Sequence, residues 1–155
     1  MEAFKQNFVK YGVLMSALTA ACLLILHGAG NVLGQQNDSP LFIVFAFGAP
    51  LLVWYLGLSA FKKAQKNRMT FKKGIIEGFR ISLVYGFTSP FVFAAYYIFF
   101  NPTVISYIRE SYKLTGAADE TVIAVDMIAQ FFGAVVVGTV YGIILSFFLK
   151  TKQRK

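Results

Sequence analysis

Four long apolar runs dominate the sequence, with charges confined to their ends. They cover about residues 11–33, 41–61, 75–100 and 121–149. A helix rises about 1.5 Å per residue, so about 20 apolar residues cross the roughly 30 Å hydrocarbon core of a bilayer. Such runs must be helical because a bilayer offers backbone groups no water, and a closed barrel would show short alternating strands instead. The sequence therefore predicts an all-α, integral membrane four-helix bundle, with residues 1–155 forming a single four-span transmembrane domain.

The composition agrees with a membrane protein. Hydrophobic residues make up 57% of the chain and the mean hydropathy is +0.61, whereas a soluble domain of this size needs more polar residues on its surface. Lys5, Lys10 and the segment "LTAAC" resemble a cleaved signal, but the apolar run continues through "LLILHGAG" and exceeds a signal core. We therefore expect a retained first span. Cys22 is the only cysteine, which excludes an intrachain disulfide.

The positive charges lie almost entirely at one set of run ends. The net charge is +8, and Arg109 and Lys113 alone stand apart from the other basic residues. Those others are Lys5, Lys10, Lys62, Lys63, Lys66, Arg68, Lys72, Lys73, Arg80, Lys150, Lys152, Arg154 and Lys155. Basic loops remain on the cytoplasmic side, so we expect cytoplasmic N and C termini.

The basic segment "KKAQKNRMTFKK" has two further interpretations besides setting topology. It could bind acidic phospholipid headgroups, at about 1 kcal/mol per charge near the surface, or it could bind RNA or an acidic partner. No nucleic-acid motif accompanies the segment. We favour the topology role, with the lipid bilayer and acidic phospholipids as partners and no nucleic acid.

The connection between the third and fourth runs has a helical pattern of its own. Val104, Ile108 and Tyr112 recur every four residues, with charged residues elsewhere on the wheel. This pattern predicts a short amphipathic outer helix over about residues 103–114, lying in the headgroups. A partner-binding element is the alternative.

Glu77 and Arg80 are candidate intramembrane polar residues because an ionisable group at the bilayer centre costs about 2.5 to 3.5 kcal/mol even on lenient scales. Their spacing puts them on one helix face as an i, i+3 pair. The third run is about six residues longer than a straight span needs, so both side chains can reach the cytoplasmic headgroups. We favour this interfacial interpretation over a working site.

His27 and Asp126 are the other candidates, at the outer ends of the first and last runs. Because histidine titrates near neutral pH, a pair between them would respond to protons. The sequence does not show that they face each other, and we favour an ordinary hydrogen bond for the histidine. Between the two candidate clusters lie only neutral groups, so no continuous charged path is visible.

Small residues recur every four positions in three runs, which allows neighbouring helices to approach closely. The sets are Ala134, Gly138, Gly142 and Ser146; Gly74 and Gly78; and Gly12, Ser16 and Ala20. These faces can pack within one bundle or between chains, and we favour packing within the bundle. Pro50 and Pro90, inside the second and third runs, predict bends.

Signatures of enzymes are missing from the sequence. It has no nucleophile elbow, phosphate loop, HExxH or clustered metal ligands, and only one histidine. We therefore predict a protein that is not an enzyme, with no catalytic residues, cofactor or metal.

Several segments together resemble a known family. They are a "KYG" start at Lys10–Gly12, a basic loop leading into "FKKGIIEGF", an "NP" at the outer end of the third run, an acidic amphipathic linker, and a glycine-containing last run before a lysine tail. In these the chain resembles domain-of-unknown-function family 4199, small four-span inner-membrane proteins of Bacteroidota, although its linker is shorter. The resemblance implies a multi-pass protein of the bacterial inner (cytoplasmic) membrane and brings no established activity or catalytic residues.

The function that we expect is a non-enzymatic accessory or assembly component, acting on other membrane proteins or further copies of the chain through its small-residue faces and outer helix. The alternative is a small oligomeric transporter or ion channel that uses Glu77, Arg80, His27 or Asp126. An enzyme acting on lipids is a third and more distant interpretation.

Overall fold

Four helices of membrane length and one short helix make up the fold. The structure, a computed structural model, describes residues 2–30 and 40–151. Over these residues the elements are α1 (Glu2–Gly28), α2 (Pro40–Ile43), the π-helix η1 (Val44–Gly48), α3 (Ala49–Ala64), α4 (Phe71–Phe99), α5 (Thr103–Ser111) and α6 (Asp119–Leu149), with no strand among them. The stretches long and apolar enough to span a membrane are Gln6–Gly28, Val44–Ala64, Phe71–Phe99 and Asp119–Leu149. The predicted all-α fold with four membrane-length helices is confirmed.

The ends of the first two spans differ from the sequence-based expectation. α1 begins at Glu2, well before the expected start at residue 11, and the expected end at residues 31–33 lies outside the described residues. The second span is a composite of α2, η1 and α3, with Pro50 in the first turn of α3. Proline lacks an N–H and its ring clashes with the carbonyl four residues earlier. The wider π-helical turn directly before Pro50 lies where that clash must be relieved.

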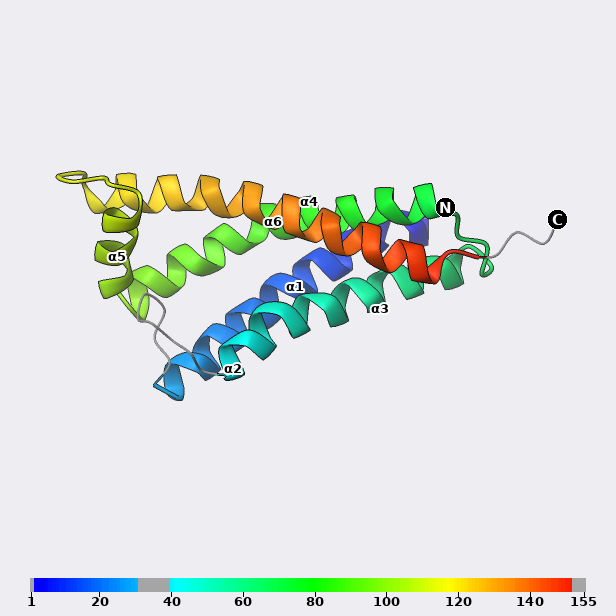
Figure 1. Cartoon of the computed structure of the whole chain (residues 1–155), viewed down its shortest axis with the longest axis horizontal. Coiled ribbons are helices and arrows are strands. Elements are labelled where there is room, and N and C mark those ends of the chain that lie inside the picture. Colours follow the sequence, from blue (N-terminus) through cyan, green and yellow to red (C-terminus); the bar gives the residue numbers. More distant parts are fainter. Residues whose placement is uncertain (1, 31–39, 152–155) are drawn as a thin grey trace.

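The two ends of the bundle have different structures (Figure 1). The start of α1, the end of α6 and the α3–α4 connection lie together at one end, called here the termini end. α5 lies at the opposite end, the α5 end. α1 and α4 both run from the termini end towards the α5 end, and α3 and α6 run back. α4 packs most extensively against α6 and then against α1, so it is the central helix.

α4 and α6 meet through their small residues. A Cβ atom on Gly78 would lie 2.7 Å from the Gly142 Cα, so the two backbones are in direct contact. Gly74 lies against the side chain of Ser146, and Gly138 lies against the side chain of Ser82. Backbones approach this closely only where side chains are small. Gly74 and Gly78 of α4 and Gly138, Gly142 and Ser146 of α6 therefore pack against one another within the chain.

α5 buries its apolar face against the bundle. Val104, Ile105 and Ile108 are only 4–7% exposed and form a core cluster with side chains of α1, α4 and α6. The predicted outer helix exists, although it ends at Ser111 and not near residue 114. The interpretation in which it lies flat with its apolar face in the headgroups is wrong, because the bundle end supplies an apolar surface for that face.

The glycine contact yields a test of the packing. Gly78→Ala places a methyl group against α6 backbone, which cannot move aside without separating the helices, so we expect the free energy of unfolding to fall by about 1–3 kcal/mol. Gly133→Ala, on the same α6 helix but with no atom near its added Cβ, is the matched control. Its unfolding free energy should stay unchanged or rise by less than about 1 kcal/mol. Unfolding by SDS in mixed micelles, followed by circular dichroism, measures both, and equal effects would contradict the proposed contact.

Candidate functional site

Polar side chains line the interface between α1 and α4 from one end of the bundle to the other. Four contacts make up this α1–α4 polar seam: Asn7 with Glu77, Ser16 with Thr88, Thr19 with Tyr85, and His27 with Tyr96. In a membrane each polar group needs a partner because lipid offers none. The seam provides these partners across a single helix pair and is the candidate functional site.

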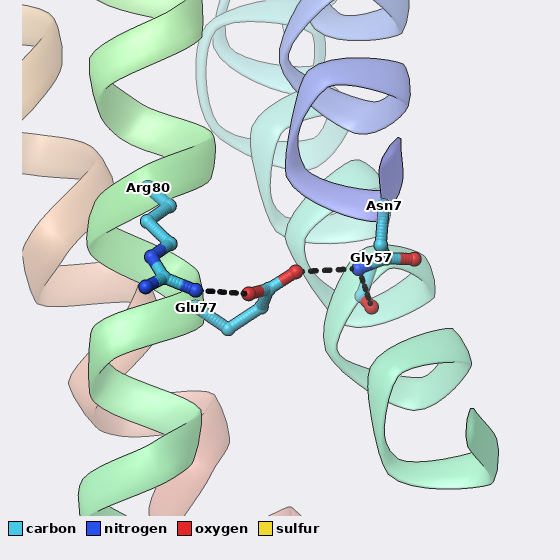
Figure 2. Close-up of polar contacts among 4 residues, drawn as sticks. All are labelled: Asn7, Gly57, Glu77 and Arg80. Carbon is cyan, nitrogen blue, oxygen red and sulfur yellow. Dashed lines mark hydrogen bonds and ion pairs between the residues drawn. The ribbon is translucent and has the colours of Figure 1, made fainter. Parts of the chain in front are cut away.

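The contact at the termini end joins three helices (Figure 2). Asn7 of α1 donates from Nδ2 to Glu77 Oε1 of α4 at 2.8 Å and to the Gly57 carbonyl oxygen of α3 at 3.2 Å. Glu77 is 1% exposed, and its other oxygen, Oε2, accepts no hydrogen bond from the described residues. The carboxylate therefore lies inside the bundle and fixes the positions of α1 and α3 relative to α4.

Arg80 and Glu77 occupy different environments despite their shared helix face. The closest approach of Arg80 Nη1 to Glu77 Oε2 is 3.9 Å, and the Arg80 side chain is 53% exposed. Its guanidinium lies 5.8 Å from the centre of the Phe8 ring. The interfacial interpretation thus fits Arg80, which extends outwards. The Glu77 side chain instead turns into the core towards Asn7.

The middle of the seam adjoins a cavity. The Thr19 hydroxyl donates to the Met15 carbonyl oxygen at 2.9 Å and lies 3.2 Å from the Tyr85 hydroxyl. Thr19 and Tyr85 line a cavity of 270 Å³ between α1, η1, α3 and α4, together with Cys22 and mainly apolar residues. The cavity lies beside the π-helical turn, and such turns are frequent at functional sites. Its lining suits an apolar ligand better than an ion.

His27 and Asp126 have separate partners at the α5 end. His27 Nδ1 lies 3.0 Å from the Tyr96 hydroxyl, and the two rings meet edge to face. Asp126, which is 7% exposed, accepts hydrogen bonds at Oδ2 from the Tyr97 hydroxyl (3.0 Å) and from Gln130 Nε2 (2.6 Å). Two neighbouring tyrosines of α4 thus stand between the histidine and the aspartate. The hydrogen-bond partner of His27 is thus Tyr96 and not Asp126.

The negative charge of Asp126 affects Tyr112, which lies outside the membrane-length helices. Tyr112 lies in the connection between α5 and α6, and burial followed by the negative charge of Asp126 raises the pKa of its hydroxyl. Both effects disfavour the phenolate, so Tyr112 keeps its proton. The start of α6, at the α5 end, is therefore an electronegative site that contains tyrosine and glutamine hydrogen-bond donors.

The two end contacts of the seam are not linked to its middle by the described hydrogen bonds, although in the middle the Thr88 hydroxyl donates to the Tyr85 carbonyl oxygen at 3.4 Å. Glu77 and Tyr85 are eight residues apart on α4, a rise of about 12 Å, and Thr88 and Tyr96 are separated equally. Within the described residues, no three His, Cys, Asp or Glu side chains lie close enough together to hold a metal ion. The arrangement can join helices and bind a ligand locally.

The sequence analysis missed Asn7 and Gln130 as partners of the candidate residues. Glu77, Tyr85, Thr88 and Tyr96 fall within about a third of the α4 helical wheel, at 100° per residue, and this stripe could have been found. Their partners on α1 follow no comparable pattern. Which residues of α1 face the stripe depends on the relative axial position of two helices, which neither sequence segment contains.

The Asn7–Glu77 contact yields a test of the seam. Asn7→Leu should lower the free energy of unfolding by about 2–3 kcal/mol, because it removes the only described hydrogen bond to a buried carboxylate. Glu77→Gln keeps an oxygen acceptor for Asn7 and should cost less than about 1 kcal/mol. The double variant Asn7→Leu/Glu77→Leu should be more stable than Asn7→Leu alone, because no unpaired carboxylate remains.

The same unfolding measurement in micelles compares these proteins with the single variant Glu77→Leu, which completes the double-mutant cycle. Thr139→Val, which removes a hydroxyl that donates to the Val135 carbonyl oxygen of its own helix, is a control for the loss of a polar group without an interhelical contact. Simple addition of the Asn7 and Glu77 effects in the double variant would show that the contact contributes nothing.

Comparison with known proteins identifies the family of the chain. The model of a family described as "Protein of unknown function (DUF4199)" matches residues 10–151, which include the whole polar seam except Asn7. No curated protein and no solved structure matches the chain significantly. The match extends over all four membrane-length helices and most of the sequence. The chain therefore belongs to the DUF4199 family of proteins of unknown function.

Proposed function

We propose that this multi-pass membrane protein is a non-enzymatic accessory or assembly component of the bacterial inner membrane. The observation that carries the proposal is the use of the interior polar groups: each contact of the seam joins two helices. Hydrogen bonds of this kind contribute about 0.6 kcal/mol each on average in membrane proteins, and they also fix which helix faces meet. Polar groups used in this way favour a scaffold over a catalyst.

A partner would contact surfaces other than those expected from the sequence. The small residues of α4 and α6 pack on each other, and the apolar face of α5 is buried in the bundle. The side chains that would face lipid remain available. α6 offers the most of them, because only 22% of the residues in its most apolar 18-residue stretch are buried, against 39% in α1 and in α4. Other membrane proteins or further copies of the chain would meet this protein within the bilayer.

The termini end is proposed to be cytoplasmic. It holds the exposed Lys63, Lys66, Arg68, Lys72 and Lys73, whereas the α5 end holds only Lys113 and Arg109 among the described lysines and arginines, and Arg109 forms an ion pair with Asp119. Basic residues are retained on the cytoplasmic side during insertion. The start of α1 and the end of α6 lie at the termini end (Figure 1), so both termini of the chain are proposed to be cytoplasmic.

Cysteine labelling tests this orientation. Cys22 is buried and is first replaced (Cys22→Ala), and then Ser111→Cys at the α5 end or Lys66→Cys in the α3–α4 connection adds one exposed thiol. A membrane-impermeant maleimide should label the Ser111→Cys protein in intact cells and the Lys66→Cys protein only after the membrane is opened. The reverse pattern would place the termini outside.

Co-purification tests the accessory role. The tagged protein is crosslinked in its native membrane and purified in mild detergent, and the proteins present in fixed proportion are identified by mass spectrometry. We expect a reproducible stoichiometric membrane partner that is absent when an unrelated multi-pass protein is purified in parallel. Recovery of the protein without such a partner, in repeated preparations, would contradict the accessory role.

The second candidate is a small oligomeric transporter or ion channel, and the observation in its favour is the ionisable Glu77, which is buried inside the bundle. Proton and monovalent-cation flux into liposomes containing the purified protein, read with pH- and potential-sensitive dyes, tests it. Flux that is lost in Glu77→Gln while the variant stays folded would favour transport. Equal dye signals from protein-containing and empty liposomes would exclude it.

A further inference from the structure

The connection between α3 and α4 has a fixed conformation. Lys66 and Asn67 both adopt left-handed backbone angles, with φ of 52° and 61°, and the Asn67 N–H donates to the Lys62 carbonyl oxygen at 3.0 Å. Met69, two residues later, is completely buried. A basic loop that served only to keep this end of the protein on the cytoplasmic side would need neither a fixed backbone conformation nor a buried methionine.

The C-terminal end of α6 holds this connection in place. The Thr151 N–H donates to the Met69 carbonyl oxygen at 2.9 Å, and the Met69 N–H donates to Thr151 Oγ1 at 3.2 Å. The Thr151 hydroxyl in turn donates to the Asn67 carbonyl oxygen. These three hydrogen bonds join the start of α4 to the end of α6, so the side chains of both ends form one surface.

That surface combines lysines with exposed phenylalanines. The Lys150 Nζ lies 4.2 Å from the centre of the Phe147 ring and 5.9 Å from that of Phe71. Phe71 is 38% and Phe147 57% exposed, and Lys72 and Lys73 follow Phe71 in the first turn of α4. We call Phe71, Lys72, Lys73, Phe147 and Lys150 the lysine–phenylalanine corner.

The corner carries uncompensated positive charge. Among the described residues the ion pairs are Arg80–Glu77 and Arg109–Asp119, so none of the three lysines has an acidic partner there. Lys73 Nζ donates to Gln65 Oε1 at 3.3 Å, and a neutral amide leaves its charge in place. The first turn of α4 has no acidic residue, although a helix N-terminus favours anions and disfavours lysines. An anion bound at the corner would offset this repulsion.

We propose that the lysine–phenylalanine corner binds an anionic phospholipid, with the three lysines around the headgroup phosphate and the two phenylalanine rings along the acyl chains. Charge complementarity requires an anion, and basic residues next to a span attract anionic lipid. The adjoining exposed rings select a lipid over a soluble anion, because they belong to helices long and apolar enough to span the membrane. The inference does not depend on the accessory role, so either can fail alone.

Lipid binding is measured on the full-length protein in phosphatidylcholine nanodiscs by electron paramagnetic resonance. Spin-labelled phosphatidylglycerol and spin-labelled phosphatidylcholine are compared for the fraction of label immobilised by the protein. We expect a preference for phosphatidylglycerol of about five- to tenfold, within what three lysines near a headgroup can supply. Lys72→Gln/Lys73→Gln/Lys150→Gln should reduce it to about one, and Lys150→Gln alone should reduce it partly.

The matched control removes the same charge from the same end of the bundle. Lys62→Gln/Lys63→Gln/Lys66→Gln changes three lysines outside the corner and should keep the preference. All variants are first checked for unchanged gel-filtration volume and helical content. Equal loss in the two triple variants would show a general charge effect and overturn the site, as would no preference in the unaltered protein.

Two competitors separate a lipid from soluble anions at constant ionic strength. Inorganic phosphate should not release the immobilised phosphatidylglycerol, because it has no chains to lie on Phe71 and Phe147. Release by inorganic phosphate would assign the corner to a soluble anion. Release by single-stranded RNA, with dependence on the same three lysines, would assign it to a nucleic acid, and either result would overturn the proposal.

Discussion

The structure depends on the direct contact between the backbones of α4 and α6. Gly78 and Gly142 carry no side chain, so the two helices approach so closely that a Cβ atom on Gly78 would lie 2.7 Å from the Gly142 Cα. Lipid is as apolar as leucine, so helices in a membrane gain little from hiding apolar side chains and associate through close packing and hydrogen bonds. The glycine contact supplies the close packing and sets where the rest of α4 lies.

Two neighbouring faces of α4 have different tasks. The face with Gly74, Gly78 and Ser82 packs on α6, and the face with Glu77, Tyr85 and Thr88 meets α1 through hydrogen bonds. Small residues bring one helix close, and polar residues fix the rotation of the other, because a buried polar group that loses its partner costs about 1–3 kcal/mol. This division makes α4 the helix to which the others are attached.

The two ends of the bundle also differ in physical character. At the α5 end, a short helix closes the bundle with its apolar face and covers the tyrosines that bind His27 and Asp126. At the termini end, Thr151 holds the α3–α4 connection and leaves its lysines exposed. One end is closed by protein, and the other presents charge at the level where headgroups would lie. A lipid-binding corner at that end is compatible with either an accessory protein or a transporter.

The sequence by itself determined the four membrane-length helices, the amphipathic helix between the last two and the small-residue face of α6, because these follow from apolar length and local spacing. It also identified Glu77, Arg80, His27 and Asp126 as the polar residues to examine. Tertiary structure alone decided that Glu77 turns inwards to Asn7 while Arg80 turns outwards, and that tyrosines stand between His27 and Asp126. The reason is physical: hydrophobic periodicity fixes which residues of a helix can be buried, whereas the partner of a buried polar group depends on the axial and rotational offset between two helices, which is set by the packing of all of them together.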